Sequence, residues 1–215
     1  MVTIKQFHAA VTAVWEKGKD NHPADPGGAT NNGVATHFIT DFASRPEGLE
    51  FLRSIGIEAR FITGYANKQA TEKTRNFDPE LLMSFTPRQC DLILMQAFWV
   101  WNGLESWPVR LTACAAYDFS VNSGATRGKR YAQRAMNHYE TAGVEPLVED
   151  GNIGPRSLAR MRDFASPEWD LKLALKLCDM RMGFLRGLST FSSFGGGWTN
   201  RVNALATFLK GNANV

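Results

Sequence analysis

The apolar positions of the chain repeat with a helical period over most of its length. Near the N-terminus they recur at spacings of three and four residues, at Ile4, Phe7, Val11, Val14 and Trp15. This spacing is typical of an amphipathic helix and predicts one over about residues 3–17. Similar patterns and helix-start residues predict further helices over about 46–55, 86–101, 109–121, 125–142, from near 155, over 166–189 and over 199–209.

Turn-forming residues interrupt this pattern in a few places. The stretch from Gly18 to about Thr36 contains DPGG and NNG, which favour loops or a short hairpin. Residues 57–80 show no clear period, and the glycine-rich FSSFGGGW of residues 191–198 is predicted to be a loop. We therefore expect a mainly α fold with at most a small β element near residues 20–40.

Composition places the protein among ordinary globular chains. It has 215 residues, 44% of them hydrophobic and 21% charged, which argues against intrinsic disorder. The strongest apolar run, Leu92–Trp101, spans ten residues and includes Gln96, so it is too short to cross a membrane. We therefore expect no stable membrane insertion.

The charges and the residues that could bind metals narrow the function further. Residues 1–110 carry 11 basic and 12 acidic side chains, whereas residues 111–215 carry 13 and 9, a net +4 that suits an anionic polymer. No basic–aromatic nucleic-acid motif accompanies this charge, so a nucleic-acid partner ranks last. The cysteines Cys90, Cys114 and Cys178 lie in apolar helical patterns and are expected to be free, buried thiols. The four histidines are scattered without ligand spacing, so we expect neither a metal site nor a cofactor.

Acidic, amide and glycine residues are dense just after the first predicted helix. Glu16 follows Trp15, and Asp25 and Thr30 come shortly afterwards. Glycoside hydrolysis needs an acid for the leaving oxygen and a second group for water or the developing cation. The candidate catalytic residues are Glu16, Asp25 and Thr30, and the candidate sugar-binding residues around them are Gly28, Asn31, Asn32 and Gly33. From the residues alone, a solvated helix-end carboxylate followed by a plain turn stays open as the alternative.

The whole stretch resembles the signature of glycoside hydrolase family 108. Members open with Glu-Gly-Gly and continue with Asp-Pro-Gly-Gly-x-Thr-x-x-Gly, which this chain matches at Glu16, Gly18, Asp25, Pro26, Gly27, Gly28, Thr30 and Gly33. The chain departs at Lys17, where the family usually has glycine. The resemblance implies a peptidoglycan muramidase with a lysozyme-like helical fold and Glu16 as the general acid.

The second half resembles the peptidoglycan-binding segment that accompanies this hydrolase module. The matching stretches are YDFSVNSG from Tyr117, DGNIGPRSLARM from Asp150 and GGGWTNRV from Gly196. We expect a catalytic module over 1–110 and a helical binding segment over 111–215, packed into one globular unit. Asp118 and Asn122, four apart on one helix face, and Trp198 are further candidates for binding substrate. The alternatives are an arginine partner for Asp118 and a place in the core for Trp198.

These observations lead to an expected function. A phage-type endolysin would cleave the β-1,4 bond between N-acetylmuramic acid and N-acetylglucosamine in bacterial peptidoglycan. A lytic transglycosylase and a non-catalytic wall-binding or secretion-assisting protein are the alternatives. The N-terminal sequence lacks the pattern of a signal peptide. We therefore expect a monomer made in the host cytoplasm, which needs a holin-like pore to reach the periplasm.

Overall fold

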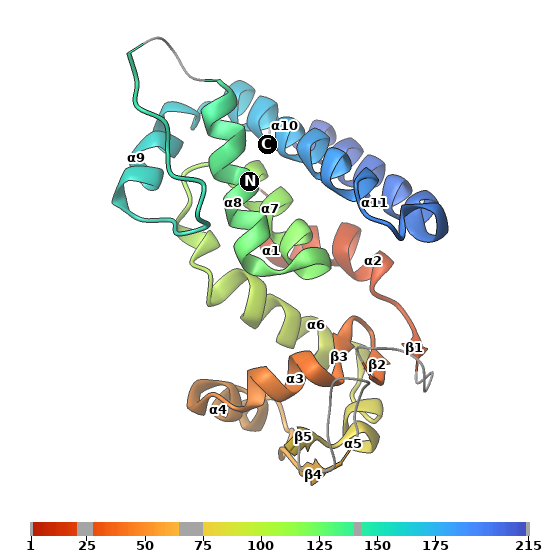
Figure 1. The fold of residues 1–215 in the computed structure, drawn as a ribbon. Coiled ribbons are helices and arrows are strands. Elements are labelled where there is room, and N and C mark those ends of the chain that lie inside the picture. The colour runs from red at the N-terminus through yellow and green to blue at the C-terminus, as the bar shows by residue number, and fades with distance from the viewer. Residues whose placement is uncertain (1, 21–27, 65–74, 140–142, 214–215) are drawn as a thin grey trace. The chain divides into compact units, whose positions relative to one another are not determined.

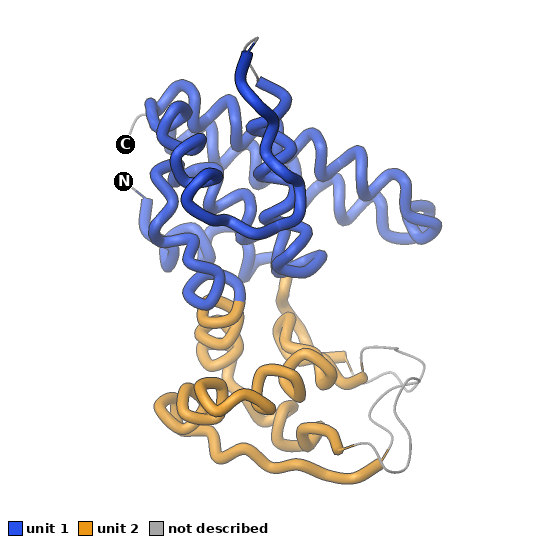
Figure 2. The backbone as a smooth tube through the Cα atoms, turned by 60° about the vertical axis from the view of Figure 1, so that its left-hand side comes forward, with its two compact units in different colours: residues 1–15, 98–215 blue, residues 16–97 orange. Residues whose placement is uncertain are grey.

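The computed structural model describes residues 2–20, 28–64, 75–139 and 143–213, and these residues form a mainly helical protein with small antiparallel sheets (Figure 1). About 67% of the described residues are helical, which confirms the predicted fold class. The chain divides into two compact units, which Figure 2 shows in different colours. Unit 1 contains residues 1–15 and 98–215, and unit 2 contains residues 16–97. The sequence predicts a division of the chain by function, into a catalytic module over 1–110 and a wall-binding segment over 111–215. That functional division stays a prediction.

Unit 1 begins with one continuous helical stretch. It consists of α1 (Ile4–Phe7), the π-helical turn η1 (His8–Thr12) and α2 (Ala13–Trp15). Thr3 caps its start through a capping box with Gln6. This confirms the first predicted helix, which ends two residues earlier than expected.

The rest of unit 1 is built around one buried helix, α7 (Arg110–Ser123). Every residue from Leu111 to Ser120 is buried, because α8 (Ala125–His138) and α10 (Pro167–Arg186) both pack against α7. Gly128 allows α8 to approach closely, since a Cβ there would lie 2.5 Å from the carbonyl oxygen of Ala116. The short η3 (Leu104–Ser106), α9 (Pro155–Asp163) and α11 (Phe191–Gly211) complete the unit.

The start of α11 corrects one prediction. Residues 191–198 were expected to form a loop, but the helix begins at Phe191 and runs through three glycines. Aromatic rings at i, i+3 and i+7, from Phe191, Phe194 and Trp198, lie beside one another on this turn. The Thr199 hydroxyl also donates to the carbonyl oxygen of Gly195. Tertiary and ring contacts here outweigh the low helix propensity of glycine.

Unit 2 combines short helices with two small sheets. The strands β1 (Lys19–Asp20), β2 (Thr30–Asn31) and β3 (Val34–Ala35) form an antiparallel sheet in that order, at the place where the sequence predicts a small β element. A second pair, β4 (Phe61–Thr63) and β5 (Arg75–Phe77), lies in the segment whose pattern predicted little structure. The helices are α3 (Thr36–Ala43), α4 (Pro46–Ser54), α5 (Pro79–Met83) and α6 (Pro87–Met95), which continues into the π-helical η2 (Gln96–Val100) at the boundary between the units.

Several sequence signals set the helix starts of the fold. Thr86 caps α6 through a capping box with Gln89, and Pro87 occupies the first turn. Ser166 caps α10 through its side chain alone, accepting from the backbone N–H of Trp169. These starts are confirmed where the sequence predicts them. The helices α3 and α5 were not predicted.

Candidate functional site

Glu16 is the first residue of unit 2 and directly follows α2 in the chain. Its side chain is half-buried and packs against the backbone of Gly33. A Cβ built on Gly33 would lie 2.8 Å from Oε2 of Glu16 and 2.9 Å from its Cβ. Gly33 also has a φ of 79°, which disfavours other residues. Glycine is therefore required at this position both by the backbone and by the carboxyl group beside it.

The small sheet fixes the chain on both sides of this contact. The backbone N–H of Asn32 donates to the carbonyl oxygen of Gly18 at 2.7 Å, and the Gly18 N–H donates to Oδ1 of Asn32 at 3.3 Å. Asn32 has a φ of 44°, a conformation that asparagine adopts more readily than most residues. The residues just after Glu16 are thus tied to the β2–β3 turn that carries Gly33.

Asn31 anchors this sheet to the rest of unit 2. Its side chain is fully buried, and Nδ2 donates to the carbonyl oxygens of Leu82 and Phe85 at 2.9 and 3.0 Å. Nζ of Lys19 donates to the carbonyl oxygen of Met83 in the same segment. The amide of Asn31 therefore serves the fold. Its expected contact with sugar stays a prediction, against which its burial speaks.

The remaining candidates of the opening loop are only partly described. Thr30 lies on the middle strand, half-buried, and its hydroxyl donates to the carbonyl oxygen of Gly28 at 3.4 Å. Gly28 is buried with a φ of 74°. Asp25 lies outside the described residues. The structure thus places Thr30, Asn32 and Gly33 on one small sheet and its turn, with the side chain of Glu16 packed against that turn.

Asp118 lies in unit 1 and is completely buried. Its carboxylate accepts from Nη1 of Arg181 at 2.6 Å, from Nε and Nη2 of Arg201 at 3.0 and 2.9 Å, and from the hydroxyl of Thr12 at 2.9 Å. Burial alone would raise the pKa of Asp118, but the charges of Arg201 and Arg181 outweigh it and lower that pKa well below its usual range. The structure therefore provides the arginine partners that the sequence left open as an alternative.

This cluster also involves two other residues of the second half. Arg201, one of the residues in the GGGWTNRV stretch, donates two hydrogen bonds to the carboxylate of Asp118. Asn122 is half-buried and accepts from Nη2 of Arg181 at 3.3 Å. The substrate contacts expected of Asp118 and Asn122 stay predictions. The carboxylate of Asp118 and Oδ1 of Asn122 already accept hydrogen bonds within unit 1.

Trp198 is the third candidate in unit 1. It is half-buried on α11, and its ring lies 5.8 Å from that of Phe194 and 6.2 Å from that of Phe191, measured between centroids. Phe194 is 58% exposed, so the aromatic group reaches the surface. Its role in binding sugar is untested by this arrangement.

Sequence reasoning missed two residues of the Asp118 cluster. Arg181 lies on the apolar face of α10, between the buried Cys178 and Leu185. Thr12 lies on the buried face of η1, and His8 one turn earlier bonds through Nδ1 to the hydroxyl of Tyr117 at 2.7 Å. A charged residue on an apolar helix face signals a buried partner, and that signal was present in the sequence.

The described residues also bear on metal ligation and membrane insertion. Within those ranges no group of three or more His, Cys, Asp or Glu side chains is placed to hold a metal ion. The three cysteines are free and buried, as predicted, and burial raises the pKa of each thiol to about 12. In the same part of the chain, no helix has the length and apolar character to cross a membrane.

Comparisons with known proteins agree with this geometry. The family model of glycosyl hydrolase 108 matches residues 9–124, more than half of the chain, and the match includes Glu16 and its sheet. A solved structure of SagA from Brucella abortus is similar over 99% of this chain and 98% of that one, with 26% identity and a TM-score of 0.67. A comparison with curated proteins finds no match. The chain therefore belongs to the glycosyl hydrolase 108 family, which supports a glycoside hydrolase that acts on peptidoglycan.

Proposed function

We propose that the protein is a muramidase that hydrolyses the β-1,4 bond between N-acetylmuramic acid and N-acetylglucosamine, with Glu16 as the general acid. One observation carries this proposal: a half-buried carboxyl group set against a glycine backbone, within the segment that matches the family. The glycine leaves room for the carboxyl group, and the paired turn holds it in place.

The proposed reaction requires two functions: an acid for the leaving oxygen and a group that activates water. The Glu16 carboxyl group gives its proton to the glycosidic oxygen as the bond to the anomeric carbon breaks. Water then adds to the anomeric carbon, and Asp25 takes the proton that the water loses. The Thr30 hydroxyl orients that water. Asn32 and Trp198 remain our proposals for contacts to the sugar, because both have surface that a glycan can reach.

The products test the bond and the reaction class together. Purified peptidoglycan is digested in water enriched in ¹⁸O, and the fragments are analysed by mass spectrometry. A muramidase gives new reducing ends on N-acetylmuramic acid that carry one ¹⁸O. Anhydro-muramic ends without ¹⁸O indicate a lytic transglycosylase, and wall binding without fragments indicates a non-catalytic protein. Either of these results contradicts the proposal.

The biological setting is also a proposal. We propose that the enzyme serves host lysis by a bacteriophage, as an endolysin that reaches the wall through a holin-like pore. The family resemblance supports this setting. Expression inside a Gram-negative bacterium should cause lysis only after the inner membrane is permeabilised, for example by chloroform. Lysis without permeabilisation contradicts the need for a pore.

A further inference from the structure

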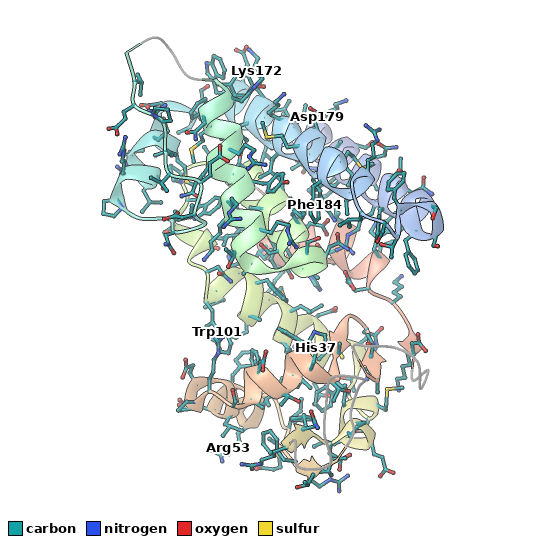
Figure 3. The ribbon with its side chains drawn as sticks, in the orientation of Figure 1. His37, Arg53, Trp101, Lys172, Asp179 and Phe184 are labelled. Atoms are coloured by element: carbon teal, nitrogen blue, oxygen red, sulfur yellow. The ribbon has the colours of Figure 1, made fainter. Side chains whose placement is uncertain are left out.

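A pocket of about 420 Å³ lies within unit 1, beside the first turns of α8. Three of its nine lining residues are arginines, at positions i, i+3 and i+7 of the helix: Arg127, Arg130 and Arg134. The rings of Tyr131 and Phe184 form aromatic walls, and Figure 3 labels Phe184 on α10. The volume is in the range of small-molecule sites.

Aromatic stacking holds two of these arginines. The guanidinium of Arg127 lies 4.6 Å from the ring centroid of Phe184, and its Nη1 donates to the carbonyl oxygen of Ser123. The guanidinium of Arg134 lies 4.8 Å from the ring of Tyr131, and its Nε pairs with Glu149 at 2.7 Å. Stacked guanidinium groups lose less conformational freedom when they bind an anion, so Arg127 and Arg134 are preorganised for binding.

Arg130 differs from both neighbours. It is exposed, and it makes no hydrogen bond or ion pair with the described part of the chain. Its five N–H donors are therefore open to a ligand. The lining contains no Asp or Glu, and Glu149 neutralises only Arg134, so the pocket keeps a net positive charge.

A solvated basic helix face is the ordinary explanation for three arginines at this spacing. Two features argue against that explanation here. The arginines line a concave pocket, and aromatic rings from two helices hold two of them in place. A flat solvated face needs neither feature, whereas an anion with an apolar body fits both.

We propose that this pocket binds a carboxylate of the peptide stem of peptidoglycan. The inference rests on the proposed substrate. In that polymer the lactyl carboxyl group of the glycan is consumed by the amide bond to the peptide, so the free carboxylates lie on the stems. A planar carboxylate matches the fork of Arg130, and the aromatic walls accept the apolar atoms of the stem. The pocket would thus recognise the peptide while the sheet of unit 2 acts on the glycan.

Binding to intact and peptide-free glycan tests this proposal. Co-sedimentation is measured in a Glu16→Gln background, which prevents cleavage, with Arg130→Gln as the variant. Its matched control is Arg162→Gln, which alters an exposed arginine on α9. On intact sacculi we expect Arg130→Gln to weaken binding about tenfold, the loss typical of one charge-assisted hydrogen bond, while the control does not. On glycan strands that are stripped by an amidase and then amidated at the lactyl carboxyl groups that stripping frees, the affinities of Arg130→Gln and of the Glu16→Gln background should be about equal.

Further arms identify the group that is bound. The free tripeptide stem should compete with sacculi, and the same peptide with amidated carboxyl groups should not. Arg130→Lys, which keeps the charge but loses the fork, should recover only part of the affinity. Equal competition by inorganic phosphate or by a DNA oligonucleotide overturns the proposal in favour of a general anion site. Unchanged binding by Arg130→Gln, or a defect that persists on stripped strands, also overturns it.

Stem binding and hydrolysis can be lost separately, so the two proposals fail in distinguishable ways. Reducing-end release by the protein with Glu16 intact reports on hydrolysis alone. Stem binding that depends on Arg130 can persist in a protein that releases no reducing ends. Conversely, hydrolysis can persist when the stem peptide does not bind.

Discussion

Two carboxyl groups of this chain occupy opposite environments, one in each compact unit. Glu16 is half-buried at the edge of a small sheet, with a glycine backbone beside it. Asp118 is wholly buried, and two arginines and a threonine donate to its oxygens. A carboxylate that is wholly buried between two arginines contributes to stability, whereas a half-buried one keeps surface that a ligand can reach. The comparison teaches that burial, more than residue type, separates the structural role of Asp118 from the proposed role of Glu16.

The largest expected effect comes from removing the proposed acid. Glu16→Gln should lower the rate of reducing-end release from purified peptidoglycan at least about 100-fold, because general acid catalysis typically contributes that much. Its melting temperature should stay close to that of the wild type. Glu50→Gln, which alters an exposed glutamate on α4 of the same unit, is the matched control and should leave the rate unchanged.

The second prediction concerns the buried cluster. Asp118→Asn leaves two arginines without their anion and should lower the free energy of unfolding by about 3–5 kcal/mol. Asp179→Asn is the control on α10, where Figure 3 labels Asp179. Asp179 is exposed, and its carboxylate forms a surface pair with Nζ of Lys176 at 3.6 Å. That change should cost less than about 1 kcal/mol. Equal losses in chemical denaturation would mean that the cluster does not stabilise unit 1.

A third prediction sharpens the account of Glu16 through its neighbour. Gly33→Ala places a Cβ 2.8 Å from Oε2 of Glu16 at a backbone φ of 79°. Gly56→Ala is a close control, because Gly56 also has a φ of 79° but a Cβ added there would meet no atom within 4 Å. Both changes should cost about 1–3 kcal/mol of stability through backbone strain. Only Gly33→Ala should also lower the turnover number, and equal turnover in both variants would contradict the positioning role of Gly33.

The smallest effect is a pH dependence of stability. The arginines lower the pKa of Asp118 in the folded state. The contribution of Asp118 to the free energy of unfolding is therefore complete above the pKa of the unfolded state, about 3.9. It is lost as the pH falls from there through the folded pKa. The difference in unfolding free energy between wild type and Asp118→Asn should therefore be constant above about pH 5 and shrink below about pH 4. A difference that stays constant down to about pH 2 would contradict the ion-pair account.

Local signals predicted much of the fold. Thr86 with Pro87, and Ser166 with Pro167, mark helix starts through chemistry that acts within one turn. The prediction of a loop over FSSFGGGW was wrong. Helix propensity considers each residue alone, so it takes no account of the ring of Phe191 packing on the buried Gly195. The strand pairing of β4 with β5 joins residues over ten positions apart, so no local pattern revealed it.

The site was less predictable than the fold. A motif located Glu16, but the role of Gly33 as the wall beside it follows only from the turn geometry. Asn31 looked like a sugar ligand, yet its amide reaches Leu82 and Phe85 more than 50 residues away. The link between Thr12 and Asp118 spans 106 positions. Sequence reasoning did not single out the three arginines of the α8 pocket, and one of the aromatic rings that shape the pocket, Phe184, comes from α10.

The account is tested most directly by the rate of reducing-end release per folded molecule, measured side by side for Glu16→Gln and Asp118→Asn. The folded fraction of each variant is fixed by circular dichroism at a temperature where both are folded. The account predicts that Glu16→Gln is folded and at least about 100-fold slower, whereas Asp118→Asn is less stable but close to wild type per folded molecule. A Glu16→Gln protein that keeps its rate within a few-fold of wild type would contradict it.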